Sequence, residues 1–240
     1  MRITSRPLAA LALLVLGACG SITDPTDPLA RRTPPPTHPS ILFVHGWNAN
    51  ATTWNTMVSR FQQDGWQSGE LTTFSYNTSQ SNATTAATIG QQVDAIRRKN
   101  GRAPVAIITH SMGALSARYY ARNLGGDGKV SALITLGGTN HGTTTAQFCF
   151  QTSCREMWPN SSFLTALNAD DETWGSPRYA TWWSPCDEVI NPDASALLNG
   201  AFNNQTACIN HSQLHEDAAV YTEVRDFVNP PTAATFIAAR

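Results

Sequence analysis

Hydrophobic residues form short continuous runs that alternate with segments of helical periodicity between about residues 41 and 228. The continuous runs predict buried strands at 41–44, 71–76, 105–108, 130–136, 179–183 and 206–209. Between them, apolar residues recur every three or four positions and predict helices over 54–61, 89–96, 114–124 and 219–228. Strands and helices that alternate in this way build a mostly parallel sheet with helices on both faces, so we expect one α/β domain over 40–230.

A serine stands at the turn between the predicted strand 105–108 and the predicted helix 114–124, in the stretch Thr109-His110-Ser111-Met112-Gly113. A serine hydroxyl is a weak nucleophile until it is exposed beside a base, and a sharp strand-to-helix turn exposes it. Gly113 supplies the second glycine of a G-x-S-x-G elbow, whereas Thr109 replaces the first. Ser111 is therefore the candidate nucleophile, and the alternative is that its hydroxyl only caps the helix.

The loop that follows the predicted strand 41–44 contains His45-Gly46-Trp47, a position from which a backbone N–H group can face the serine. In parallel sheets, ligands bind at the carboxyl ends of strands, which places this loop and Ser111 on one rim. We predict that the backbone N–H groups of Trp47 and Met112 form an oxyanion hole. We expect the elbow and this loop to be supported by His45, Gly46, His110 and Gly113.

Several motifs together resemble the small bacterial lipases of the α/β-hydrolase superfamily, typified by the minimal lipase of Bacillus. The resemblance is carried by His45-Gly46, the stretches 110–113, 135–140 and 184–190, and a pair of histidines four residues apart. It implies the α/β-hydrolase fold over about 41–228. The segment 141–178 matches the minimal family poorly, so we interpret it as an insertion that affects substrate access.

The resemblance also implies a catalytic triad that cleaves carboxylic esters through an acyl-enzyme. It aligns Ser111 with the nucleophile, Asp187 with the acid and His215 with the base. His211, the other histidine of the pair, is then a supporting residue, and it is the alternative base. The resemblance favours Asp187 over three other acidic residues, Asp170, Glu188 and Asp193. Neither a metal nor an organic cofactor is required by this chemistry.

Three functions remain open from the sequence. A lipase or carboxylesterase and a depolymerase of polyhydroxyalkanoate or synthetic polyester differ in substrate but share their chemistry. A non-catalytic surface-binding lipoprotein is disfavoured because every triad position is filled. Trp47, Trp182 and Trp183 are candidate walls of an apolar acyl site, and the alternative is that they belong to the core.

The N-terminus has the pattern of a bacterial lipoprotein signal peptide over 1–18. Arg2 and Arg6 precede an apolar run over 8–16, which is too short to span a bilayer stably. The run ends in Leu16-Gly17-Ala18-Cys19, a lipobox in which Cys19 becomes the lipid anchor. The alternative is an ordinary signal peptide with a coincidental cysteine.

The segments that flank the predicted domain have no apolar period. Residues 19–39 are rich in Pro and Thr and predict an extended tether, and residues 231–240 form a C-terminal tail. We therefore expect an exported protein, anchored as a lipoprotein on the outer membrane or cell surface, or released from it.

Four cysteines remain besides Cys19, and in an exported chain four cysteines favour two disulfides. Of the three possible connectivities we prefer Cys149–Cys154 and Cys186–Cys208. The first pair would close a loop within the insertion, and the second would tie the acid loop to the segment before the histidine pair. A zinc site is the competing interpretation of these cysteines.

The charged residues are balanced, with 16 Lys and Arg against 17 Asp and Glu and a formal net charge of −1. The positive residues are scattered and form no basic patch, so nucleic acid is not expected as a partner. We expect a monomer whose partners are an ester substrate, either lipid or polyester, and a membrane reached through the lipid anchor.

Overall fold

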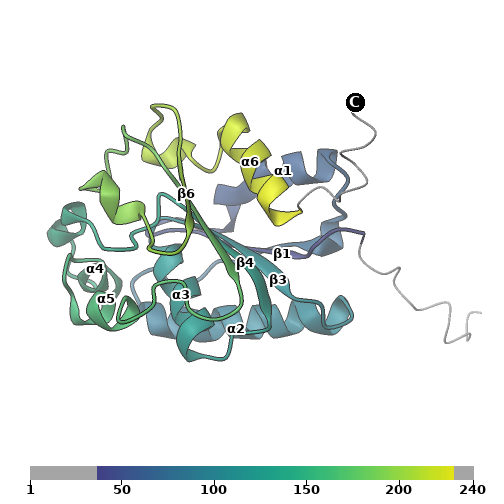
Figure 1. Ribbon diagram of the computed structural model, residues 1–240, viewed down its shortest axis with the longest axis horizontal. Helices are drawn as coiled ribbons and strands as arrows, with labels where there is room; N and C mark the ends of the chain where they lie inside the picture. The colour runs from purple at the N-terminus through teal and green to yellow at the C-terminus, as the bar shows by residue number, and fades with distance from the viewer. Residues whose placement is uncertain (1–36, 230–240) are drawn as a thin grey trace, which may run out of the picture. The chain divides into compact units, whose positions relative to one another are not determined.

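The computed structural model describes residues 37–229, which contain a six-stranded sheet with the order β2-β1-β3-β4-β5-β6 (Figure 1). The strands are β1 (Ile41–Val44), β2 (Leu71–Thr73), β3 (Val105–His110), β4 (Val130–Leu136), β5 (Arg178–Trp183) and β6 (Phe202–Gln205). Every neighbouring pair is parallel. The predicted α/β fold is therefore confirmed.

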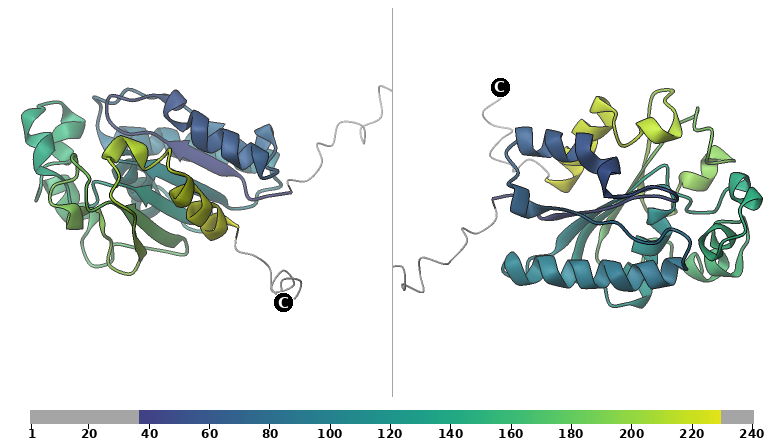
Figure 2. Two further views of the ribbon diagram at one scale, coloured as in Figure 1. Left: turned by 90° about the horizontal axis from the view of Figure 1, so that it is seen from above. Right: turned by 180° about the vertical axis from the view of Figure 1, so that it is seen from behind.

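Four main helices cover the two faces of the sheet, as Figure 2 shows. One face carries α1 (Asn55–Gln63) and α6 (Ala218–Val228), and the other carries α2 (Asn82–Lys99) and α3 (Gly113–Asn123). The alternation of side chains along β1 explains both layers, because successive residues of a strand point to opposite faces. Ile41 and Phe43 pack toward α1 and α6, whereas Leu42 and Val44 pack toward α2 and α3.

The sixth strand lies four residues earlier than predicted, at Phe202–Gln205 rather than at 206–209. It is an edge strand that pairs only with β5, and Phe202 is 62% exposed. Its middle is polar, and the Asn203 side chain bonds to Thr181 and Leu198. A strand without a buried face has no apolar pattern, so a prediction based on hydrophobicity placed the strand in the following segment.

The predicted insertion contains three short helices, η3 (Thr144–Phe148), α4 (Thr152–Glu156) and α5 (Ser162–Leu167). Five of its residues pack in a separate small core against Met112 and Leu115: Ala146, Cys154, Met157, Leu164 and Leu167. Glu156 fixes the segment to α2 by accepting hydrogen bonds from Ser81 Oγ and from the backbone N–H of Asn82. The insertion is therefore packed beside the serine turn.

The remaining elements are single 3-10 turns. They are η1 (Ala51–Trp54), η2 (Ser68–Glu70), η4 (Asp193–Ala196) and η5 (His211–Gln213). No helix between residues 37 and 229 is long and apolar enough to cross a membrane.

The end of the predicted tether lies on the domain. Glu70 Oε1 accepts hydrogen bonds from the backbone N–H groups of Thr37 and His38, and the His38 ring stacks on Trp66 with centroids 4.1 Å apart. The predicted signal peptide, Cys19 and the tail 231–240 lie outside the described residues.

Candidate active site

Ser111 occupies the sharp turn between β3 and α3, with a φ of 55°. This left-handed backbone is strained for a residue with a side chain, and such strain often marks functional sites. A Cβ on Gly113 would lie 2.6 Å from the carbonyl oxygen of His45, and one on Gly46 would lie 2.8 Å from Ser111 Cβ. Both glycines are therefore required for the close approach of the two loops.

Thr109, which replaces the first glycine of the motif, does not crowd the turn. It belongs to β3, and its hydroxyl donates a hydrogen bond to the carbonyl oxygen of Ile134 at 2.9 Å. The variant motif is compatible with the elbow because the position it changes is still inside the strand.

Asp187 forms a buried pair with His211, in which His211 Nδ1 lies 2.8 Å from Asp187 Oδ2. The other carboxylate oxygen, Oδ1, accepts hydrogen bonds from the backbone N–H groups of Val189 and Ile190, at 2.9 and 2.8 Å. The carboxylate is thus fixed by two backbone donors and orients the imidazole. Within residues 37–229, Nε2 of His211 is buried and has no hydrogen-bond partner.

The structure does not pair Asp187 with His215, the residue that the resemblance aligned with the base. The turn η5 brings His211 to the carboxylate, and His215 follows that turn. The His215 ring lies near Trp54 and His110, with centroid distances of 5.9 and 4.8 Å. The predicted Asp187–His215 contact is therefore wrong, and His211 is the histidine with the geometry of a base.

Two further histidines, His45 and His110, make hydrogen bonds to the loops around the site. His110 Nε2 donates to the carbonyl oxygen of His211 at 3.0 Å, which fixes the backbone of that residue. His45 Nδ1 donates to the carbonyl oxygen of Gly46 at 2.9 Å, and its ring stacks on Tyr76. Burial lowers the pKa of both histidines, that of His110 well below its ordinary value.

The two backbone groups predicted to form the oxyanion hole remain available. Among the described residues, neither the N–H of Trp47 nor that of Met112 donates a backbone hydrogen bond. The Trp47 indole Nε1 donates to Gln151 Oε1 at 2.9 Å, which connects this loop to the insertion.

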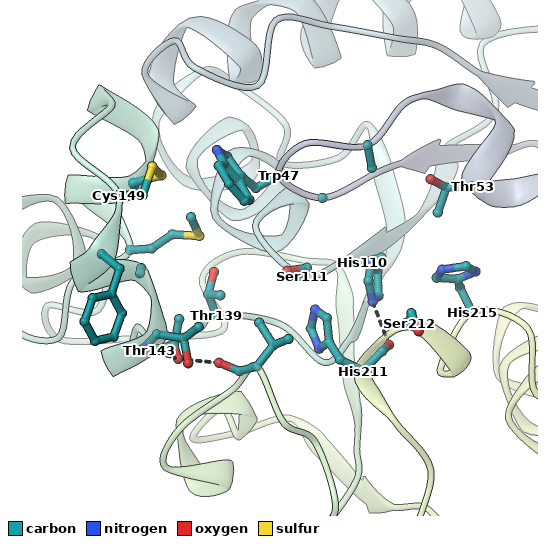
Figure 3. A pocket seen from close by; sticks show the side chains of 18 residues that line it. Trp47, Thr53, His110, Ser111, Thr139, Thr143, Cys149, His211, Ser212 and His215 are labelled. Carbon is teal, nitrogen blue, oxygen red and sulfur yellow. Dashed lines mark hydrogen bonds between the residues drawn. A yellow bond between two sulfur atoms is a disulfide. The ribbon is translucent and has the colours of Figure 1, made fainter.

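A cavity of about 560 Å³ opens over Ser111 and His211 (Figure 3). One part of its wall comes from the insertion and includes Ala146, Phe148, Cys149, Cys154 and Met157. Trp47 lines the cavity, as expected, but Trp182 and Trp183 do not. Trp182 is a core residue whose indole donates to Glu223. The cavity has the size of a small-molecule site and is mainly apolar near the insertion.

Both predicted disulfides, Cys149–Cys154 and Cys186–Cys208, are confirmed. The four sulfurs are bonded in pairs and are not available as zinc ligands. The second bridge starts next to Asp187 and reaches the segment just before His211. Ser184 reinforces this connection, because its hydroxyl donates to the carbonyl oxygen of Ile209 at 2.6 Å. The loop that carries Asp187 and the loop that carries His211 are thus joined by a disulfide and by a hydrogen bond.

Comparison with known proteins gives a family match and several structural matches. The model of the family described as Lipase (class 2) matches residues 38–228. The mature lipase BlEst2 of Bacillus licheniformis superposes with a TM-score of 0.72 at 15% identity, covering 82% of this chain and 94% of that one.

Two other solved structures share the fold. Lipase B of Aspergillus fumigatus has a TM-score of 0.66 at 14% identity, covering 79% of this chain and 52% of that one. The product of lin2722 from Listeria innocua has a TM-score of 0.62 at 12% identity, covering 82% and 96%.

Proposed function

The chain belongs to the class 2 lipase family and is a carboxylic ester hydrolase, and from this premise we propose that Ser111, His211 and Asp187 are its catalytic triad. The proposal is carried by one observation, the buried 2.8 Å contact between Asp187 and His211 in a cavity that Ser111 also lines. His211 replaces His215 in the assignment that the resemblance implied. Ser111 Oγ and His211 Nε2 are not hydrogen-bonded, and such contacts are often longer without substrate than in the reacting complex.

In the proposed mechanism, His211 Nε2 removes the proton from Ser111 Oγ as that oxygen attacks the ester carbonyl carbon. Asp187 keeps the Nδ1 proton in place and stabilises the imidazolium. The N–H groups of Trp47 and Met112 bind the oxyanion of the tetrahedral intermediate. The intermediate collapses when His211 returns the proton to the leaving alcohol, and water then releases the acid from the acyl-enzyme by the same route.

The proposed substrate is a lipid ester whose acyl chain lies against the apolar wall of the insertion. The alternative is a polyester of hydroxyalkanoate or synthetic type, which the same chemistry would cleave. A comparison of p-nitrophenyl esters from acetate to palmitate with a triglyceride emulsion and a polyester film distinguishes the two. Faster release of acid from the film than from the emulsion would favour the depolymerase.

We also propose that the protein is exported and acts as a monomer anchored to a membrane by lipid on Cys19. The signal sequence supports export, and so do two disulfides, which persist in oxidising compartments. Incorporation of radiolabelled palmitate into the wild type but not into Cys19→Ser is the expected result. Equal labelling of the two would refute the lipid anchor.

The triad is tested by covalent labelling with a fluorophosphonate probe. The wild type is expected to label stoichiometrically, whereas Ser111→Ala is expected to lose labelling and about five to six orders of magnitude in kcat. The melting temperature of the variant serves as the control for folding. Substantial ester hydrolysis by pure, folded Ser111→Ala would remove Ser111 from the role of nucleophile.

A further inference from the structure

The cavity has two chemically different sides, and Ser111 lies between them in Figure 3. On one side lie Cys149 and Thr143 of the insertion, and the Thr143 hydroxyl already donates to the carbonyl oxygen of Val189. The insertion also contributes the apolar side chains of Ala146, Phe148 and Met157. On the opposite side lie Thr53, Ser212 and His215, which present two hydroxyl groups and an imidazole. The proposed mechanism uses none of these three side chains.

The position of His211 indicates which half of an ester occupies the polar side. As general acid, His211 must reach the leaving oxygen, so the leaving alcohol lies on the His211 side of Ser111. Figure 3 shows His211 on the same side of Ser111 as Ser212 and His215. The acyl chain then lies toward Cys149. This step rests on the proposed function.

His215 is suited to bind a polar group of that alcohol. It is 8% exposed and lines the cavity, and its Nδ1 is buried without a hydrogen-bond partner among residues 37–229. Nε2 is not buried in this way, so it is the ring nitrogen that a bound molecule can reach. A hydroxyl that bonds to Nε2 leaves Nδ1 as it is, so the gain from binding is the one new hydrogen bond at Nε2.

The charge of this side favours a neutral group on the ligand. No Lys, Arg, Asp or Glu lines the cavity in the described part of the chain. Burial, the largest cause, lowers the pKa of His215 below its ordinary value, so the neutral imidazole predominates at pH 7. A carboxylate or phosphate would find no cation here, whereas a hydroxyl group can both donate to and accept from these side chains.

We propose that Thr53, Ser212 and His215 form a leaving-group subsite that binds a free hydroxyl on the alcohol half of the substrate. The preferred substrates are esters of polyols that keep an unesterified hydroxyl near the scissile bond. Partial glycerides and glycol monoesters have this chemistry, and simple alkyl esters lack it.

The test compares 2-hydroxyethyl butanoate with propyl butanoate, which differ only by a hydroxyl in place of a methyl group. Both esters form the same butanoyl-enzyme, so deacylation is common to them. The wild type is expected to have the higher kcat/KM with the hydroxyethyl ester. His215→Phe is expected to lower the ratio of the two kcat/KM values about five- to tenfold, as for one lost hydrogen bond.

Thr53→Val provides a second variant of nearly unchanged shape and is expected to lower the ratio in the same direction. Thr139→Val is the matched control, because Thr139 lines the same cavity but lies on the other side of Ser111 from His215 (Figure 3). It is expected to leave the ratio unchanged. Melting curves show which variants are folded. If His215→Phe does not fold, the ratio measured for Thr53→Val decides whether the subsite exists.

The outcomes separate this proposal from the one on which it rests. If folded Ser111→Ala still hydrolyses both esters, the triad is refuted and the subsite with it. If Ser111→Ala is inactive but the folded variants at positions 53 and 215 keep the wild-type ratio, only the subsite is refuted. A fall in the ratio for Thr139→Val as large as for His215→Phe would also overturn the subsite.

Discussion

Replacement of Asp187 by Asn should separate the catalytic role of the carboxylate from its structural role. Oδ1 accepts two backbone hydrogen bonds, from Val189 and Ile190, and Oδ2 faces Nδ1 of His211. In Asp187→Asn, the amide oxygen will keep the two backbone donors, because an NH₂ group in that place would face two N–H groups. The amide NH₂ must then face the histidine.

An NH₂ donor opposite Nδ1 requires that nitrogen to accept, so the imidazole proton moves to Nε2. His211 in that tautomer has no lone pair for the proton of Ser111. The expected loss is about 10⁴-fold in kcat, as for the same change in a serine protease triad, which corresponds to about 5.5 kcal/mol of transition-state stabilisation.

Asp187→Ala is the contrasting variant. It removes both acceptors and leaves two backbone N–H groups without partners, each at a cost of about 1–3 kcal/mol in stability. We therefore expect Asp187→Asn to melt close to the wild type and Asp187→Ala to melt well below it, while both lose activity.

The assay is the initial rate of p-nitrophenyl butanoate hydrolysis at pH 7.5, with active serine titrated by a fluorophosphonate. Thermal melting of each variant is recorded in the same buffer. A folded Asp187→Asn that keeps more than about a hundredth of the wild-type kcat would refute the tautomer argument.

Three further perturbations probe the supports of the site. Replacing both Cys186 and Cys208 by Ala should remove about 3 kcal/mol of stability by loop-closure entropy and lower kcat as well; an unchanged melting temperature would contradict this. Burial lowers the pKa of His110 in the folded state, so its contribution to stability is complete above about pH 6.5 and is lost as the pH falls. Urea titrations should therefore show up to about 2 kcal/mol less stability at pH 5.0 than at pH 7.5. His110→Gln should show a flatter dependence of stability on pH. Gly113→Ala places a Cβ 2.6 Å from the carbonyl oxygen of His45, so it should cost about 1–3 kcal/mol by urea titration, and a neutral effect would show that the two loops can separate.

The order of strands and helices could be predicted because most of the sheet is buried on both faces. The run 105–108, for example, is continuous and apolar and predicts the start of β3 at Val105, whereas the strand continues to His110. The same argument fails at β6, where Asn203 and Asn204 are polar and only one neighbouring strand is present. Edge strands of this kind are recognised by their hydrogen bonds and not by hydrophobicity.

The loops that carry Ser111 and Asp187 could be predicted, whereas the histidine that faces Asp187 and the positions of Trp182 and Trp183 could not. Ser111 and Asp187 follow strands whose ends are visible in the sequence, so their loops are limited in where they can go. The two histidines follow β6, the strand with the weakest signal, and they are separated by about one turn of helix. Which of them faces Asp187 depends on the local turn η5, and spacing alone does not determine it.

The identity of the base is the central claim, and kinetic comparison of the two histidines tests it most directly. His211→Ala should lose about as much kcat as Ser111→Ala, roughly five to six orders of magnitude, and the double variant should be scarcely worse, because residues that act as one unit are non-additive. His215→Ala should lose no more than about tenfold with p-nitrophenyl butanoate, whose leaving group carries no free hydroxyl. If folded His215→Ala is instead the inactive variant and His211→Ala the mild one, the Asp187–His211 pair is not the catalytic pair.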